Sequence, residues 1–322
     1  MTLAKGYFLT LTAVVAIAGT VVVGGLLMAG HFATEPTGAV PVEATPAYGR
    51  YMMRQTAESL GPDHEDANMR YTGTRLACAS CHLDNGIRPG TLSLLQTSTR
   101  YPRISGRDGG MRDLRDRING CMERSMNGRA LPRDSIEMIA IETYIEGLGD
   151  RYAAMSPSRR APHEPAGFAE PDRAASVDAG RAIYADRCQL CHGENGAGLR
   201  ATANPSKGYI FPPLWGADSF NNGAGMTRVL TASRFIKARM PFGNPDLTND
   251  QAYDVAAFVN SHARPAKSNL ERDYPDLTKK PIDSPYPPYA DDFSNEQHRL
   301  GPFRPIREYY QSLEEDSAPG AR

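Results

Sequence analysis

Apolar residues are distributed unevenly along the chain, and the longest uninterrupted run lies near its start. Residues 7–30 contain no charged side chain, Lys5 precedes them, and no Lys or Arg follows until Arg50. A membrane-spanning helix needs ~20 mainly apolar residues, and basic residues stay on the cytoplasmic side. The pattern predicts a transmembrane anchor at 1–30, a linker at 31–47, and export of everything that follows.

The alternative for the first thirty residues is a cleaved secretory signal peptide. Its apolar core usually spans only ~7–15 residues and precedes a small-residue cleavage site, and no clear site of that kind follows residue 30. An uncleaved anchor is therefore favoured, and both interpretations place the remaining chain on the periplasmic side of a bacterial cytoplasmic membrane.

Two later segments carry apolar residues at helical spacing. One runs from a capping box at Thr248 and Gln251 through Val259. The other follows Asp134, which we expect to act as N-cap together with Glu137. Helices are also predicted at 48–59 and 178–186, so the fold class is mostly α.

The composition excludes one large class of function. The 322 residues carry a formal net charge of -1, and no run of Lys or Arg marks a phosphate-binding face. We therefore expect no nucleic-acid partner. The length allows two modest domains.

The pattern C-x-x-C-H occurs twice, as CASCH at 78–82 and CQLCH at 188–192. This spacing is typical of covalent haem c attachment, in which two thiols bond the porphyrin and the histidine ligates the iron. A zinc site would need further Cys or His at regular spacing, and a thioredoxin motif a βαβ context. The predicted attachment residues are Cys78, Cys81, Cys188 and Cys191, and the predicted iron ligands are His82 and His192.

The surroundings of the two motifs repeat as well. At an offset of 110 residues, YPRISG at 101–106 aligns with FPPLWG at 211–216. A repeat in register indicates duplication of one structural unit. We predict two tandem class I-like cytochrome c domains at 48–155 and 176–265. The Pro-rich segment 156–175, in which His163 is expected to be solvated, links them, and residues 266–322 are expected to form an extended C-terminal tail with a frayed end.

Each haem iron needs a sixth ligand or an open site. In the second domain Met240 precedes the last helix and is the preferred ligand. Met226 and Lys237 are its rivals, and a lysine must first lose its proton.

In the first domain Cys121 lies about one helical turn from the position equivalent to Met240. It is outside both C-x-x-C-H motifs, and a thiolate ligand would lower the potential of that haem. The rival ligands are Met122, Met126 and His64, and a further alternative is a small buried cysteine.

Arginine is unusually dense near Cys121. Some of these side chains are expected to bind haem propionates or form ion pairs. Two or three would form a pocket for a small dianion, with Ser125 as a further donor. The arginines are Arg100, Arg103, Arg107, Arg112, Arg115, Arg117, Arg124 and Arg129.

Taken with both haem motifs, the stretches NGCMERSMNG at 119–128, FPPLWGADSFNNGAGM at 211–226 and HRLGPF at 298–303 resemble the thiosulfate dehydrogenase family of dihaem c-type cytochromes. The likeness covers residues 48 to about 310. It implies that a His82/Cys121 haem joins two thiosulfate ions into tetrathionate, and that a His192/Met240 haem passes the electrons on.

On the family's pattern, Arg107, Arg117 and Ser125 match residues that hold the substrate, and Arg239 replaces a lysine beside the distal methionine. The resemblance and the placement of Cys121 also raise the hypothesis that its sulfur carries a substrate adduct. A cytochrome or a quinone would accept the electrons. Alternative functions are a membrane-tethered dihaem electron carrier and a tetrathionate reductase.

Overall fold

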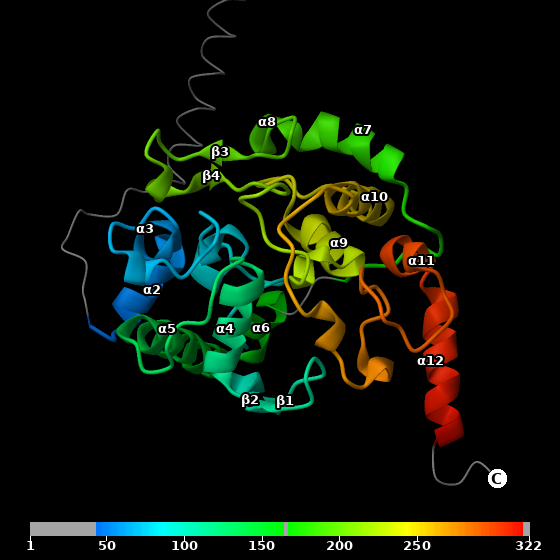
Figure 1. Cartoon of the computed structure of the whole chain (residues 1–322), viewed down its shortest axis with the longest axis horizontal. Helices are drawn as coiled ribbons and strands as arrows, with labels where there is room; N and C mark the ends of the chain where they lie inside the picture. Colours follow the sequence, from blue (N-terminus) through cyan, green and yellow to red (C-terminus); the bar gives the residue numbers. More distant parts are fainter. Residues whose placement is uncertain (1–42, 164–166, 318–322) are drawn as a thin grey trace, which may run out of the picture. The chain divides into compact units, whose positions relative to one another are not determined.

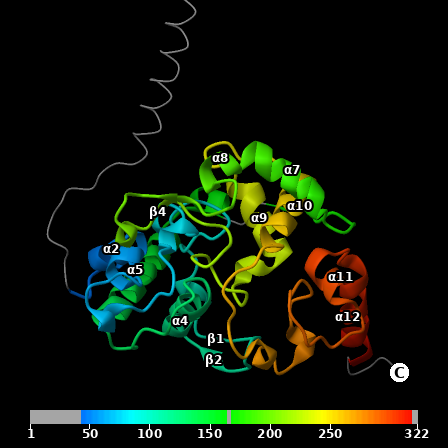
Figure 2. The same cartoon turned by 45° about the horizontal axis from the view of Figure 1, so that its top comes forward.

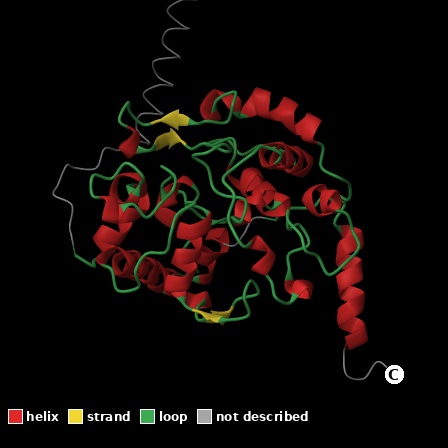
Figure 3. Ribbon diagram, viewed as in Figure 1, coloured by secondary structure: helices red, strands yellow, loops and turns green. Residues whose placement is uncertain are grey.

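The computed structural model describes residues 43–163 and 167–317, and helices dominate it (Figure 3). The described residues contain two antiparallel two-stranded sheets, in which β1 (Arg103–Ile104) pairs with β2 (Met111–Arg112) and β3 (Leu199–Arg200) with β4 (Tyr209–Phe211). The mostly α fold is confirmed. The predicted anchor at 1–30 lies outside the described residues, and no helix within 43–163 or 167–317 has the length and hydropathy to cross a bilayer.

The first domain is built on the crossing of two helices. α2 (Pro46–Arg54) packs on α5 (Ile136–Ala153), and a Cβ on Gly49 would lie 2.0 Å from the carbonyl oxygen of Ala140. The single predicted helix at 48–59 is broken at Gln55, and α3 (Thr56–Leu60) follows. The Thr56 hydroxyl accepts a hydrogen bond from the Cys78 amide at 3.1 Å, which ties the break to the first haem motif.

The second domain repeats this crossing. α7 (Val177–Arg187) packs on α10 (Asn249–Asn260) (Figure 1, Figure 2), and a Cβ on Gly180 would lie 2.0 Å from the Asp254 carbonyl oxygen. α7 leads directly into α8 (Gln189–His192), which carries the second motif. In the first domain the loop 61–77 intervenes between the helix and the motif.

The last helix of each haem domain, α5 in the first and α10 in the second, has a different N-cap. Thr248 and Gln251 form the predicted capping box of α10. The predicted cap at Asp134 is wrong, because Ser135 is the residue with extended backbone angles and its hydroxyl accepts from the Met138 amide at 3.2 Å. The hydroxyl thereby satisfies an amide that has no partner within the helix.

The C-terminal segment is not extended throughout, which corrects the prediction for 266–322. It ends in α11 (Asn295–Leu300) and α12 (Arg304–Ser317), drawn in red in Figure 1. Phe303 and Ile306 are fully buried in the core of the second domain, and this burial holds the helices in place. Helix α12 also continues through residues that were predicted to fray.

The remaining elements complete the two domains. They are α4 (Leu114–Arg124), α6 (Pro157–Arg160) in the predicted linker, and α9 (Val229–Arg239). Short 3-10 turns lie at Ala67–Met69, Cys78–Ser80, Asp84–Gly86, Ser98–Arg100, Ala161–His163, Pro205–Lys207, Gly225–Thr227, Leu270–Arg272 and Leu277–Lys279.

Helix α4 begins with a capping box that can be tested. Asp113 Oδ1 accepts from the Asp116 amide at 2.9 Å, and Asp116 Oδ2 accepts from the Asp113 amide at 3.0 Å. Replacing Asp113 by Ala should lower the free energy of unfolding by ~1 kcal/mol. Asp113→Asn keeps a capping side chain and should cost less, as urea unfolding at neutral pH would show.

The same carboxylate makes stability depend on acid. The hydrogen bond from Arg133 lowers the pKa of Asp113 from 3.8 to about 2. A group with a depressed folded-state pKa stabilises the protein above its unfolded pKa and loses that effect as the pH falls. Relative to Asp113→Asn, wild type should therefore lose stability as the pH falls from 3.8 to about 2. If the free energies of unfolding of the two proteins fall in parallel over this range, the prediction is contradicted.

Candidate functional site

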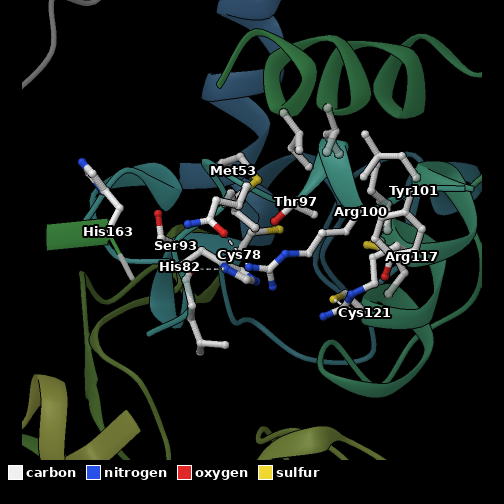
Figure 4. Close-up of a pocket in the computed structure, with 18 of the residues that line it drawn as sticks. Met53, Cys78, His82, Ser93, Thr97, Arg100, Tyr101, Arg117, Cys121 and His163 are labelled. Atoms are coloured by element: carbon white, nitrogen blue, oxygen red, sulfur yellow. Dashed lines mark hydrogen bonds between the residues drawn. The ribbon is translucent and has the colours of Figure 1, made fainter. Parts of the chain in front are cut away.

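A cavity of about 310 Å³ lies against the first haem motif (Figure 4). Its apolar wall includes Met53, Leu114, Ile118, Ile141 and Ile145. His82 and Cys121 both line it, one from the motif and the other from α4. The two predicted ligands of the first iron are thus brought to one cavity by segments about 40 residues apart.

The orientation of His82 suits iron ligation. Its Nδ1 lies 2.9 Å from the carbonyl oxygen of Leu92. A carbonyl only accepts, so Nδ1 carries the proton and the Nε2 lone pair remains available for a metal. His192 in the second domain repeats the arrangement, with Nδ1 2.9 Å from the Pro212 carbonyl oxygen.

The motif cysteines are free thiols in surroundings that favour neutral sulfur. Burial raises the pKa of Cys78 to about 11, of Cys81 to about 12 and of Cys188 to about 11, and it also raises that of Cys191. The thioether sulfur of an attached haem is neutral, so both C-x-x-C-H segments fit this group. The described residues hold no cluster of three or more His, Cys, Asp or Glu that would bind a bare metal ion.

Cys121 differs from the other four cysteines in its electrostatics. Burial alone would raise its pKa, but opposing influences, of which the charge of Arg117 is the largest, outweigh it and lower the pKa from 9.0 to about 6. Arg117 lies one turn earlier on α4 and donates from Nη1 to Cys121 Sγ at 3.0 Å. The site therefore stabilises a thiolate at neutral pH, the form that ligates iron and reacts as a nucleophile.

The rival ligands are placed differently. Met122 and Met126 are buried in the first core, 2% and 4% exposed, although Met122 also reaches the cavity wall. His64 lies in an exposed turn, where its Nδ1 is 3.1 Å from the Asp66 amide.

In the second domain, Lys237 donates from Nζ to the Leu247 carbonyl oxygen at 2.6 Å, and Met226 packs against the core. Met240 follows the last residue of α9.

Two predicted substrate residues lie apart from the cavity wall. Arg107 donates from Nη1 to Asp273 Oδ2 at 2.7 Å and packs over the ring of Tyr274. Ser125 follows α4 as its C-cap, and its amide donates to the carbonyl oxygen of Cys121. Of the three predicted substrate-binding residues, only Arg117 lines the cavity.

Arg100, Tyr101 and His163 also line the cavity, although none of them was predicted to have a specific role there. Figure 4 shows Arg100 reaching towards His82 and Arg117 lying beside Cys121. His163 was expected to be solvated in the linker, but its side chain is half-buried, lines the cavity and packs against the Tyr152 ring. Arginine density was the signal for Arg100, whereas no local pattern marks His163.

A buried ion cluster joins α4 to the C-terminal segment. Asp273 accepts from Arg124 at 2.9 and 2.8 Å and also pairs with Arg107. Replacing Asp273 by Asn would leave two arginines without their counter-charge and should lower the free energy of unfolding by about 3 kcal/mol. The exposed Asp276, which pairs with Lys279, provides the control: Asp276→Asn should change the urea midpoint little, and an equal loss in both variants would contradict the prediction.

Comparisons with known proteins agree with this geometry. Residues 68–151 match the family model described as SoxA/TsdA, cytochrome c domain, and residues 175–259 match the model described as Cytochrome C oxidase, cbb3-type, subunit III. These are two cytochrome c domains, each with one C-x-x-C-H motif, and the chain binds two haem c groups covalently.

Several relatives are named thiosulfate dehydrogenase. The protein of Psychrobacter arcticus is 39% identical over 63% of this chain and 61% of its own length. That of Stutzerimonas stutzeri is 35% identical over 70% of this chain and 71% of its own length, and that of Allochromatium vinosum is 38% identical over 61% of this chain and 72% of its own length.

A solved structure is similar as well. Thiosulfate dehydrogenase (TsdBA) from Marichromatium purpuratum, in its as-isolated form, superposes with a TM-score of 0.60 at 32% identity, over 73% of this chain and 49% of that chain. This chain thus spans about half of the solved chain and 61% of the Psychrobacter relative. By these matches, the chain belongs to the thiosulfate dehydrogenase family.

Proposed function

We propose that this protein is a dihaem thiosulfate dehydrogenase. Its first haem, ligated by His82 and Cys121, is the site of oxidation, and its second, ligated by His192 and Met240, passes the electrons to an acceptor. The observation that carries the proposal is the placement of Cys121 beside Arg117 on the wall of the cavity that His82 also lines. An electron carrier without substrate chemistry has no need of a thiolate and three arginines, Arg100, Arg103 and Arg117, at this place.

The reaction must bring two anions together. Two thiosulfate ions join through one new sulfur–sulfur bond, tetrathionate forms, and two electrons leave. Each ion carries two negative charges, so their approach is opposed by repulsion that nearby fixed cations reduce. Arg100 and Arg117 supply such cations at the cavity wall. Arg donates two parallel hydrogen bonds to an oxyanion and stays charged.

The residues of the site have different roles in the proposed reaction. Haem iron supplies one-electron redox chemistry when it is bound. As a ligand, the Cys121 thiolate would lower the potential of the first haem. Arg117 keeps that sulfur anionic, and on the cavity wall its guanidinium is also placed to bind a substrate oxyanion. Ser125, the C-cap of α4, lies apart from the cavity wall, so its role at the substrate stays a prediction. The role of Arg107 at the substrate stays a prediction that its pairing with Asp273 does not support directly.

The cellular setting is part of the proposal. The hydropathy of residues 1–30 supports an anchor in the cytoplasmic membrane, with both haem domains on the periplasmic side. A cytochrome or a membrane quinone would then accept the electrons. A carbonate wash should leave the full chain in the membrane fraction, and complete release would contradict the anchor.

The test is a steady-state assay of the purified exported part with both haems attached. Thiosulfate is the donor, ferricyanide the acceptor, and tetrathionate the measured product. Oxidation with two ferricyanide reduced per tetrathionate would support the proposal. In a second assay a reduced dye donates electrons to tetrathionate. Activity in that assay alone would assign the reverse reaction, and no activity in either assay would favour the electron carrier.

A further inference from the structure

Arg239 joins the second domain to the loop that follows the first haem motif. It is the last residue of α9 and directly precedes Met240. Its Nη2 donates to the carbonyl oxygen of Thr91 at 2.9 Å and lies 3.4 Å from that of Arg88, while Nε lies 3.3 Å from Thr91 O. The Pro89 carbonyl accepts from Nη2 as well. One guanidinium thus binds three carbonyls of a segment about 150 residues away in the sequence.

This loop also holds His82 in place. The residue after Thr91 is Leu92, whose carbonyl accepts the Nδ1 hydrogen bond of His82 at 2.9 Å. Leu92 has a φ of 61°, in the left-handed region that bulky side chains rarely adopt. Such a conformation is strained and persists only when neighbouring contacts maintain it. The bonds from Arg239 to the preceding carbonyls are contacts of this kind.

A second contact joins this loop to the segment that contains Met240. The guanidinium of Arg88, within the loop, lies 5.1 Å from the ring centroid of Phe242, two residues after Met240. Arg239 and Phe242, on either side of Met240, therefore both contact the loop. Burial lowers the pKa of Arg239, and the nearby charge of Arg88 adds to this effect. The guanidinium nevertheless stays protonated, so a charged group is placed between the domains with backbone carbonyls as its hydrogen-bond acceptors.

Together these contacts form a continuous bonded path. It runs from the His82 ring through a hydrogen bond to the Leu92 carbonyl, along the backbone to the Thr91 carbonyl, and through a second hydrogen bond to Arg239 and then Met240. Its two ends are the proposed ligands of the two irons. The neighbouring basic residue Lys237 makes no such bridge, since its ammonium binds Leu247 within the second domain.

We propose that Arg239 is a positioning residue that fastens the His82 loop to the Met240 segment and completes a bonded route for electrons between the two haems. This inference rests on the proposed function in one respect, the assignment of His82 and Met240 as ligands of different irons. It does not depend on which substrate supplies the electrons.

Arg239→Gln in the protein loaded with both haems tests the proposal, with Arg234→Gln as the matched control. Arg234 is an exposed arginine on the same helix. A photoreduced flavin delivers electrons in a flash experiment, and absorbance follows their transfer from one haem to the other. We expect transfer in Arg239→Gln to slow by about tenfold or more, because small displacements have large kinetic effects. The near-infrared band of methionine-ligated haem should weaken, and Arg234→Gln should match wild type.

Unchanged transfer rates and an unchanged methionine band in Arg239→Gln would overturn the proposal. So would equal slowing in both variants, because the effect would then follow from lost surface charge. The flavin supplies electrons without thiosulfate, so these outcomes are separate from the assay of the proposed function. If electron transfer is slowed in Arg239→Gln but the wild-type protein does not oxidise thiosulfate, the role of Arg239 is supported and thiosulfate is rejected as the substrate.

Discussion

Replacing Cys121 by Met is expected to abolish turnover while both haems remain attached. The attachment residues are untouched, so haem content and mass should equal those of wild type. A neutral thioether in place of a thiolate withdraws a strong donor, and the reduction potential of the first haem should rise. We expect tetrathionate formation to fall by about a hundredfold or more, equivalent to ~2.7 kcal/mol in the barrier. Spectroelectrochemistry and the thiosulfate assay provide the two measurements.

Met122→Leu is the matched control, because Met122 is the next residue on α4 and also reaches the cavity wall. The change is nearly volume-conserving and should leave both the potential and the rate close to wild type. Full activity in Cys121→Met would reject the role of the thiolate. Loss of activity in Met122→Leu with Cys121 intact would instead identify Met122 as the required residue.

Replacing Arg117 by Gln is expected to reduce the rate most strongly at neutral and acid pH. The guanidinium is the largest influence that lowers the pKa of Cys121 to about 6, so without it the pKa should rise. A smaller fraction of the sulfur is then deprotonated at pH 7, and the acid limb of the pH–rate profile should move to higher pH. A lost charge-assisted hydrogen bond is worth ~1.5–3 kcal/mol, which corresponds to roughly 10–150-fold in rate.

The pH profile separates this effect from loss of substrate binding. If the rate of Arg117→Gln partly recovers at high pH, Arg117 acts by stabilising the Cys121 thiolate. If KM instead rises equally at every pH, Arg117 acts only by binding thiosulfate. Arg112→Gln is the control, because Arg112 is half-exposed and pairs with Asp108 on the surface. A profile for Arg117→Gln that superposes on wild type would contradict both roles.

Local sequence patterns predicted the covalent chemistry and the repeated helices well. C-x-x-C-H specifies two thiols and a histidine within five residues, and a helix carries its apolar stripe and its cap in consecutive positions. Where two adjacent polar residues can both cap a helix, the local pattern does not distinguish them. The pattern favoured Asp134 as the cap of α5, but backbone angles select Ser135. The tail was predicted as extended because Phe303 and Ile306 gain their stabilisation from a core built by distant segments.

The sequence by itself determined that this chain holds two haem c groups, that its fold is mostly helical, and that Cys121 is unlike the other cysteines. Those properties depend on residue identity and short spacing. Only the tertiary structure decided that Arg117 faces Cys121 while Arg107 is paired with Asp273, and that Arg239 reaches the loop beside His82. Arginines are chemically alike along the sequence, and they differ only in the partner that folding places within hydrogen-bonding distance.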